Sequence, residues 1–293
     1  DPQSPHVVEL SGERLKQGAH YDESFENEII LKDGSVYSIS FLAEDMAGNV
    51  AEKISVDNIS FDSTSPKMVI LKPKPSVFTN QLTVDFSLNE NLSSGILIIE
   101  RTGGPNDSSS PHQIDLIDDM LIQSPKLSVD VTREVNLVSN AVYKISIEAI
   151  DIAGNNGVSD IVEGVTFDDI PPVISIISPD IDTFINSPIV GLRSNEMLKI
   201  ASVEWVWDEG EDDIKKSHTS KLIGGSLDEG EYPQVKFEPE PPLVSGAWYL
   251  VAFNGTDRAG NSSVYNHGRL FFDNTPPNLL GKYPKSGSYV NIP

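Results

Sequence analysis

The sequence contains no cysteine, few basic residues and no long apolar run. Without Cys among its 293 residues, the chain can form no disulfide, thiolate metal site or cysteine nucleophile. Lys and Arg number 21 against 44 Asp and Glu, and the net charge of −23 argues against nucleic acid, which needs a positive surface. No stretch reaches the roughly 18 apolar residues of a membrane span, so we expect no membrane insertion in this segment.

Signatures of enzymes are also missing. The sequence contains no HExxH, Walker, SxxK or GxSxG pattern. Three of the five histidines, His6, His112 and His218, are spaced by 106 residues. They could be zinc ligands, but such ligands come in groups of three or four, so we favour structural histidines at strand edges. Acid pairs are abundant in so acidic a chain and carry little weight. We expect no enzyme.

An internal repeat determines the organisation of the chain. EDMAGN at 44–49 recurs as IDIAGN at 150–155 and TDRAGN at 256–261, and tyrosines recur with the same spacing at Tyr37, Tyr143 and Tyr249. The spacing predicts two complete units, residues 67–171 and 172–276. Residues 1–66 match the later part of a unit, and residues 277–293 match the opening of another. The chain is therefore interpreted as a window on a longer tandem array, in which residues 1–66 lack their first strands.

Each unit is predicted to be all-β. Tyr143, Ile145 and Ile147 alternate with polar residues, which is typical of a half-buried strand. The other strands expected in the first complete unit are 68–72, 82–88, 95–101, 111–116, 126–131 and 161–167. Seven short strands per unit of about 106 residues predict tandem immunoglobulin-like β-sandwiches, and the tyrosine suits the tyrosine corner of that fold. Trp205 and Trp207 share a strand face with Val203, so we interpret them as core or core rim rather than a sugar-stacking platform.

The pattern Tyr-x7-Asp-x-Ala-Gly-Asn, followed about 16 residues later by Phe-Asp-x-x-x-Pro, resembles the bacterial Ig-like repeats of large surface proteins and adhesins. The resemblance covers essentially the whole chain. It implies an extracellular, stalk-forming array that is in some members stiffened by calcium at domain junctions. The short proline-bearing linkers FDSTSP, FDDIPP and FDNTPP would hold consecutive repeats semi-rigidly.

Recurring polar residues are predicted to converge where the chain enters each sandwich. The linker before a unit, the end of its second strand and the loop after its sixth strand meet at that pole of an Ig-like fold. Carboxylate and amide oxygens are the ligands that calcium prefers, and clustered carboxylates repel one another without a cation. The candidate calcium ligands at the first junction are Asp62, Asn89, Glu90, Asp151 and Asn155. Those at the second junction are Asp168, Asp169, Asn195, Glu196, Asp257 and Asn261.

A purely structural explanation of these residues stays open. Asp and Asn accept hydrogen bonds from turn amides and Gly supplies a positive φ, so Asp-x-Ala-Gly-Asn could be simply a hairpin turn. Glu90 and Glu196 could be solvated residues at the rim. Asp45 is the weakest candidate, because the strands that would complete its site lie before residue 1.

The sequence as a whole predicts a structural module array of an extracellular, cell-surface protein that acts as a stalk, adhesin or filament. Its partners would be neighbouring repeats of the same chain, and other copies or a surface ligand at the tip of the array. An alternative from another class is that these are accessory modules of a large secreted polysaccharide-degrading enzyme. A third hypothesis, direct ligand binding by the modules, requires exposed aromatic residues outside the core faces.

Overall fold

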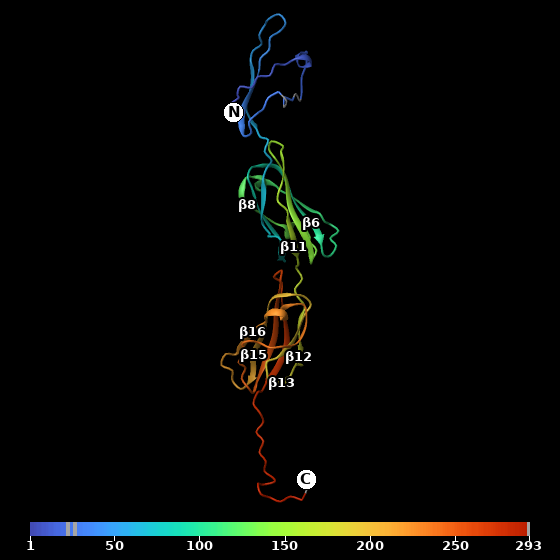
Figure 1. The fold of residues 1–293 in the computed structure, drawn as a ribbon, viewed down its shortest axis with the longest axis vertical. Coiled ribbons are helices and arrows are strands. Elements are labelled where there is room, and N and C mark those ends of the chain that lie inside the picture. The colour runs from blue at the N-terminus through green and yellow to red at the C-terminus, as the bar shows by residue number, and fades with distance from the viewer. Residues whose placement is uncertain (22–23, 26–27, 292–293) are drawn as a thin grey trace. The chain divides into compact units, whose positions relative to one another are not determined.

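The computed structural model describes residues 1–21, 24–25 and 28–291 (Figure 1). Two compact units are present. Unit 1 comprises Asp1–Ser76, Leu82–Leu137 and Ala141–Val165, and unit 2 comprises Val77–Gln81, Val138–Asn140 and Thr166–Pro293. In the described residues the only α-helix is the single turn α1 (Val131–Glu134), which no pattern in the sequence predicted. No helix of this part of the chain is long and apolar enough to cross a membrane.

The first complete repeat is built from two sheets. One has the order β3-β5-β8, and the other has the order β4-β11-β9-β6-β7, with β10 added on β9. The first sheet comprises β3 (Met68–Lys72), β5 (Thr83–Leu88) and β8 (Ser124–Asp130). The second comprises β4 (Phe78–Thr79), β6 (Leu92–Gly103), β7 (His112–Asp115), β9 (Ala141–Asp151), β10 (Asn156–Val158) and β11 (Val162–Phe167). All seven predicted strands are confirmed to within a few residues, whereas β4 and β10 were not predicted.

The second complete repeat has the same architecture. A sheet of order β12-β14-β17 is accompanied by a sheet of order β13-β19-β18-β15-β16. The first sheet comprises β12 (Ile174–Ser178), β14 (Val190–Ser194) and β17 (Gly230–Val235). The second comprises β13 (Thr183–Ile185), β15 (Leu198–Gly210), β16 (Ser217–Lys221), β18 (Ala247–Asp257) and β19 (Ser262–Phe272). In both repeats a short strand, β4 or β13, pairs in parallel with the last strand. The pairs β5–β8, β6–β9, β12–β14, β15–β18 and β18–β19 are antiparallel.

Alternating side chains fill each sandwich. Along β18, Tyr249, Val251 and Phe253 are at most 2% exposed, and one core contains them together with Leu192 of the other sheet. Fully burying one such side chain contributes about 1.5–3 kcal/mol, so these alternating faces dominate the stability of the sandwich. Trp205 is fully buried and Trp207 packs partly against the same core, which confirms their interpretation as core and core rim.

The tyrosine of the sixth strand forms the predicted corner. The hydroxyl of Tyr249 accepts a hydrogen bond from the backbone N of Val244 at 2.8 Å. The hydroxyl of Tyr37 accepts the equivalent bond from Lys32 N at 2.7 Å. This corner bond fixes the chain just before the strand whose far end carries Asp257.

Residues 1–66 contribute the two-stranded ribbon β1 (Ser35–Phe41) and β2 (Ile54–Phe61). Ile39 and Phe41 are about half exposed, at 47% and 50%, whereas Ile145 and Ile147, 106 residues later, are fully buried. The same alternation is present in both strands, but the described part of residues 1–66 places no second sheet against these side chains.

Candidate metal centres

The Asp-x-Ala-Gly-Asn segment is a hairpin turn closed by its own aspartate. Asp151 Oδ1 accepts from the backbone N of Asn155 at 2.9 Å, and its Oδ2 accepts from the Asn155 side-chain Nδ2 at 2.9 Å. Asp257 binds Asn261 in the same way, at 2.9 and 2.8 Å. Gly154 and Gly260 have φ of 97° and 106°, a conformation that favours glycine. The structural explanation of this motif as a turn is therefore confirmed.

The same turn occurs in residues 1–66. Asp45 accepts from Asn49 N and from Asn49 Nδ2, both at 2.8 Å. Gly48 has a φ of 88°. The same turn thus forms in all three repeats.

Around two of these turns, three carboxylates come together from separate segments. In unit 1 the group is Asp62, which follows β2, Glu90, which lies between β5 and β6, and Asp151 at the end of β9. One oxygen from each residue lies within 4.8 Å of the others. Asp151 is 1% exposed, and the other two are half-buried. The predicted convergence of three segments is present.

Unit 2 repeats the arrangement with deeper burial. The group consists of Asp168 directly after β11, Glu196 between β14 and β15, and Asp257 at the end of β18. One carboxylate oxygen from each residue again lies within 4.8 Å of the others. Asp168 is 4% exposed and Asp257 is 0% exposed. We call these two groups the linker carboxylate clusters, because each includes the aspartate that begins a linker.

The four predicted asparagine ligands have structural hydrogen bonds. Asn155 Nδ2 donates to the carbonyl of Asp62 at 3.1 Å, and Asn261 Nδ2 donates to the carbonyl of Asp168 at 2.7 Å. These bonds tie each linker to the turn.

The other two asparagines each hold the residue directly before the first strand of a sandwich, β3 or β12. Asn89 Oδ1 accepts from Lys67 N at 2.6 Å, and Asn195 Oδ1 accepts from Val173 N at 2.7 Å. Asp169 is exposed and donates its backbone N to Ser139 Oγ, and its carboxylate is not one of the three that converge. The asparagines thus position the linkers, and the carboxylates supply the charge.

Electrostatics distinguish the members of each cluster. Burial and then the charges of Asp168 and Asp257 raise the pKa of Glu196. Burial, with further contributions from Asp62 and Asp151, raises the pKa of Glu90, although a hydrogen bond from its neighbour Asn89 opposes the rise. In each cluster, the charges of the neighbouring aspartates therefore disfavour ionisation of the glutamate.

Asp151 behaves in the opposite way. Burial opposes its ionisation, but the side-chain and backbone hydrogen bonds from Asn155, with those from the turn, outweigh that effect and lower the pKa of Asp151. An aspartate held in the ionised form beside a glutamate resisting ionisation is an arrangement that a cation would relieve.

The donor set fits calcium. Calcium takes six to eight hard oxygen ligands at about 2.3–2.6 Å, so ligand atoms on opposite sides of the ion lie up to roughly 5 Å apart. Three carboxylates within 4.8 Å of one another meet that limit, and each can bind through one or both oxygens. Waters and backbone carbonyls would complete the shell. The metal assignment itself stays a prediction.

A second recurring group was missed by the sequence reasoning. In unit 1, His112 Nε2 lies 2.7 Å from Asp107 Oδ2, and the Tyr143 hydroxyl donates to the same oxygen at 2.8 Å. Asp107 and His112 are 7% exposed and Tyr143 is fully buried. Burial opposes ionisation of Asp107, but the bonds from His112 and Tyr143 outweigh it and lower the pKa of this aspartate.

The same hydrogen-bonded group occurs in the other two repeats, buried in unit 2 and only partly buried near the start of the chain. Its members are Asp213, His218 and Tyr249 in unit 2, and Asp1, His6 and Tyr37 near the start of the chain. Each histidine has one aspartate partner within a closed hydrogen-bonded group, which favours the structural interpretation over zinc. The signal was present in the sequence, since Asp1, Asp107 and Asp213 recur with the same 106-residue spacing.

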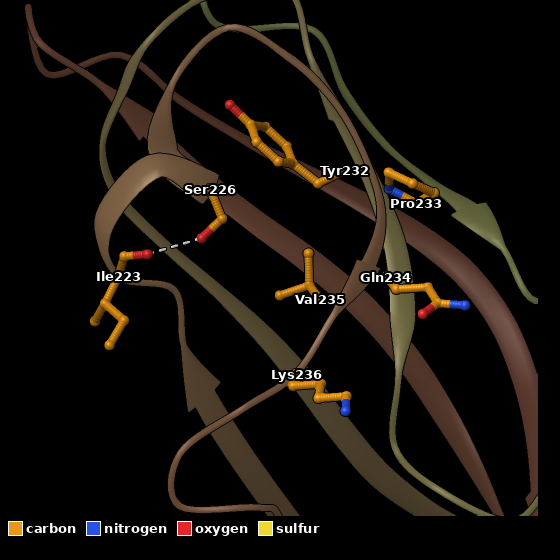
Figure 2. A pocket seen from close by; sticks show the side chains of 7 residues that line it. All are labelled: Ile223, Ser226, Tyr232, Pro233, Gln234, Val235 and Lys236. Atoms are coloured by element: carbon orange, nitrogen blue, oxygen red, sulfur yellow. Dashed lines mark hydrogen bonds between the residues drawn. The ribbon is translucent and has the colours of Figure 1, made fainter.

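Unit 2 also has a shallow hollow of about 470 Å³ beside β17 (Figure 2). Its lining residues are Ile223, Ser226, Tyr232, Pro233, Gln234, Val235 and Lys236. The Ser226 hydroxyl donates to the carbonyl of Ile223 at 2.9 Å, so its one serine is engaged with the chain itself. The lining contains no histidine or carboxylate, so this hollow offers no acid–base pair.

Comparisons with known proteins give weak likenesses only. The sequence matches no protein-family model and no curated protein. A tetra-tandem repeat in the extending region of a large adhesion protein is 13% identical, with 81% of this chain and 56% of that chain covered and a TM-score of 0.29. Fibronectin(III)-like modules of CbhA from Clostridium thermocellum are 12% identical, with 70% and 94% covered and a TM-score of 0.31.

A third solved structure, the FN1–FN3 domains of chicken CNTN1, is 10% identical, with 81% and 77% covered and a TM-score of 0.30. This chain spans 56% of the length of the adhesion-protein structure. At these identities and TM-scores the likenesses carry no argument about function, and the architecture rests on the sheets, corner tyrosines and repeated turns described above. On those grounds the chain is built of immunoglobulin-like β-sandwich repeats.

Proposed function

We propose that this chain is a non-enzymatic structural array of an extracellular surface protein, a stalk, adhesin or filament segment whose linkers bind calcium. The observation that carries the proposal is the linker carboxylate cluster, formed twice by the same three segments. Each cluster joins a linker aspartate to two loops of the sandwich that follows it in sequence. A cation bound there would couple the linker to that sandwich.

The mechanism is mechanical. Without calcium, the raised pKa of Glu196 reports that burial and repulsion disfavour its charge, which weakens the attachment of the linker. Calcium would replace this repulsion by attraction to three carboxylates, while the bond from Asn261 to the carbonyl of Asp168 fixes the linker backbone. The short proline-bearing linker then limits the remaining freedom. In this account, calcium sets the angle between consecutive repeats.

An extracellular location suits this mechanism. Calcium sites of extracellular modules commonly have dissociation constants of roughly 0.1–1 mM, so a modest three-carboxylate site is occupied only where calcium is abundant. The partners in this account are the neighbouring repeats of the same array, with other copies or a surface ligand at the tip.

The test is a calcium titration of the chain followed by melting temperature. We expect wild-type protein to melt higher in calcium than in chelator, because an ion that binds only the folded state stabilises it in proportion to its occupancy. Asp151→Ala should remove the contribution of the unit 1 cluster and leave that of the Asp257 cluster. A melting temperature that is equal in calcium and chelator would remove both clusters as metal sites.

A further inference from the structure

The outward face of the five-stranded sheet in unit 2 carries an aromatic row. Strand register places Phe184 of β13 beside Phe271 of β19, and Phe271 beside Trp248 of β18. Ring centroids are 5.0 Å apart for Phe184–Phe271, 5.2 Å for Trp248–Phe271 and 6.0 Å for Phe184–Trp248. Phe184 is 74% exposed, and the other two are half-buried. We call these three residues the aromatic row.

Charged side chains border the aromatic row. Arg269 lies with its guanidinium carbon 4.5 Å from the centre of the Trp248 ring. Its Nε donates to Asp182 Oδ1 at 2.8 Å and its Nη1 donates to Glu209 Oε1 at 3.0 Å. Glu209 pairs in register with Trp248, so the carboxylate of Glu209 lies directly beside the aromatic row.

A shallow groove begins at one end of the aromatic row. It has a volume of about 530 Å³, and Phe184 forms part of its wall together with Asn186, Gln234 and Asp273. Apolar rings next to amide and carboxylate groups are typical of sites that bind a ligand having both an apolar face and polar substituents.

The fold does not require these residues. In the first complete repeat the matched register positions hold Phe78, Thr166, Val142 and Gly103, so one aromatic residue remains of three. Glu163 takes the backbone position of Arg269, since its carbonyl accepts from Ser76 N as that of Arg269 accepts from Asp182 N, so the cation is absent from this position. The same sheet forms without the aromatic row, so the fold does not explain why these apolar side chains are exposed. A binding function does explain it, since exposed apolar patches mark interaction sites.

We propose that the aromatic row and its charged border bind a neutral oligosaccharide through one or two pyranose rings. The C–H face of a pyranose stacks on aromatic rings, and its hydroxyls pair with Arg269, Asp182 and Glu209. The rings meet at interplanar angles of 64° and 63°, so they form a compact, faceted surface suited to a few sugar rings rather than a flat polymer sheet.

Charge favours this ligand over the alternatives. An acidic polymer is repelled at long range by a chain with a net charge of −23. A neutral sugar meets no such barrier. This inference goes beyond the proposed structural role, and none of its residues belongs to a linker carboxylate cluster.

The test is isothermal titration of the whole chain with cellohexaose, xylohexaose, mannohexaose and maltohexaose, with tryptophan fluorescence as a second signal. We expect binding of at least one of the four, with a dissociation constant in the micromolar to millimolar range. Trp248→Val should weaken that binding at least tenfold. This variant takes the residue of the matched position Val142, so the fold should tolerate it.

Further variants separate binding from folding. Phe271→Thr, matched to Thr166, and Arg269→Gln should each weaken binding as well, whereas Trp207→Phe, at a tryptophan outside the row, should not. Oligosaccharide binding should be equally strong in calcium and in chelator. The result of this test therefore does not depend on whether the linker carboxylate clusters bind calcium.

Three results would overturn the proposal. They are failure of all four hexasaccharides to bind at millimolar concentration, binding that Trp248→Val leaves unchanged, and dimerisation in solution that Trp248→Val abolishes. The last would make the row an interface between copies.

Discussion

Replacing Glu196 by glutamine should stabilise the protein in the absence of calcium, which is unusual for a substitution of a partly buried residue. Burial and the charges of Asp168 and Asp257 raise the pKa of Glu196 in the folded state. The folded state therefore holds this proton more tightly than the unfolded state does. Stability is lost as pH rises from the unfolded pKa of this carboxyl through its folded pKa.

The size of the effect follows from the distances in the cluster. Two unit charges 4.8 Å apart, the limit that the cluster meets, repel by about 0.9 kcal/mol in water and about 3.5 kcal/mol at an effective dielectric constant of 20. Solvent screening and the polar amide that remains reduce the effect of this repulsion. We therefore expect Glu196→Gln to raise the free energy of unfolding by about 1–2 kcal/mol. For a domain of roughly 100 residues, each kcal/mol raises the melting temperature by about 4–8 °C.

The assay is differential scanning calorimetry at pH 7, in chelator and in calcium. The control is Glu240→Gln, which removes one negative charge from an exposed position of the same unit. We expect Glu196→Gln to melt above wild type in chelator and to gain less than wild type from added calcium. The reasoning is refuted if Glu196→Gln melts below wild type in chelator, or if calcium stabilises both proteins equally.

Four other substitutions, the last with a matched control, test the remaining structural features. Asp257→Ala should cost about 1–3 kcal/mol in chelator, because it leaves the turn amides and Asn261 without their acceptor, and urea unfolding would measure it. Tyr249→Phe should cost about 2–4 kcal/mol, because both the corner bond and the bond to the Asp213 carboxylate are lost, and it should leave the calcium response intact. Burial opposes ionisation of Asp213, but hydrogen bonds from His218 and Tyr249 outweigh burial and lower the pKa of this carboxyl. Asp213 therefore stabilises the fold at pH values above its unfolded pKa. Acid titration of wild type should therefore show stability falling as pH drops through and below the ordinary aspartate range, and Asp213→Asn should flatten this slope. Gly157→Ala should strongly destabilise unit 1, since its Cβ would lie 2.2 Å from the carbonyl oxygen of Pro66, whereas Gly154→Ala in the open turn should lose only the strain of its positive φ.

The repeat in the sequence was enough to predict the sandwich, because burial alternates with period two and the same alternation returns after 106 residues. It also predicted the convergence of Asp62, Glu90 and Asp151, since strand order in an Ig-like fold places those three loops at one pole. Strands β4 and β10 were missed, because two or three residues are too few to show alternation and their pairing is decided by distant partners.

The side-chain contacts were harder to predict than the strands. Asn155 and Asn261, two of the predicted asparagine ligands, also donate hydrogen bonds that tie linkers to turns, and these contacts depend on backbone positions that only the folded chain defines. The aspartates of the buried Asp–His–Tyr groups lie in loops, where no periodicity marks burial. The aromatic row becomes visible only when register aligns β13, β19 and β18, since Phe184, Trp248 and Phe271 are far apart in sequence.

Small-angle X-ray scattering of the chain, in calcium and in chelator, tests the central claim most directly. If calcium at the linkers fixes the angle between repeats, its addition should narrow the distribution of chain dimensions and bring the maximum dimension to a single value. The double variant Glu90→Gln, Glu196→Gln should lose that response while keeping its folded sheets. Identical scattering of wild-type protein in calcium and chelator would contradict the account.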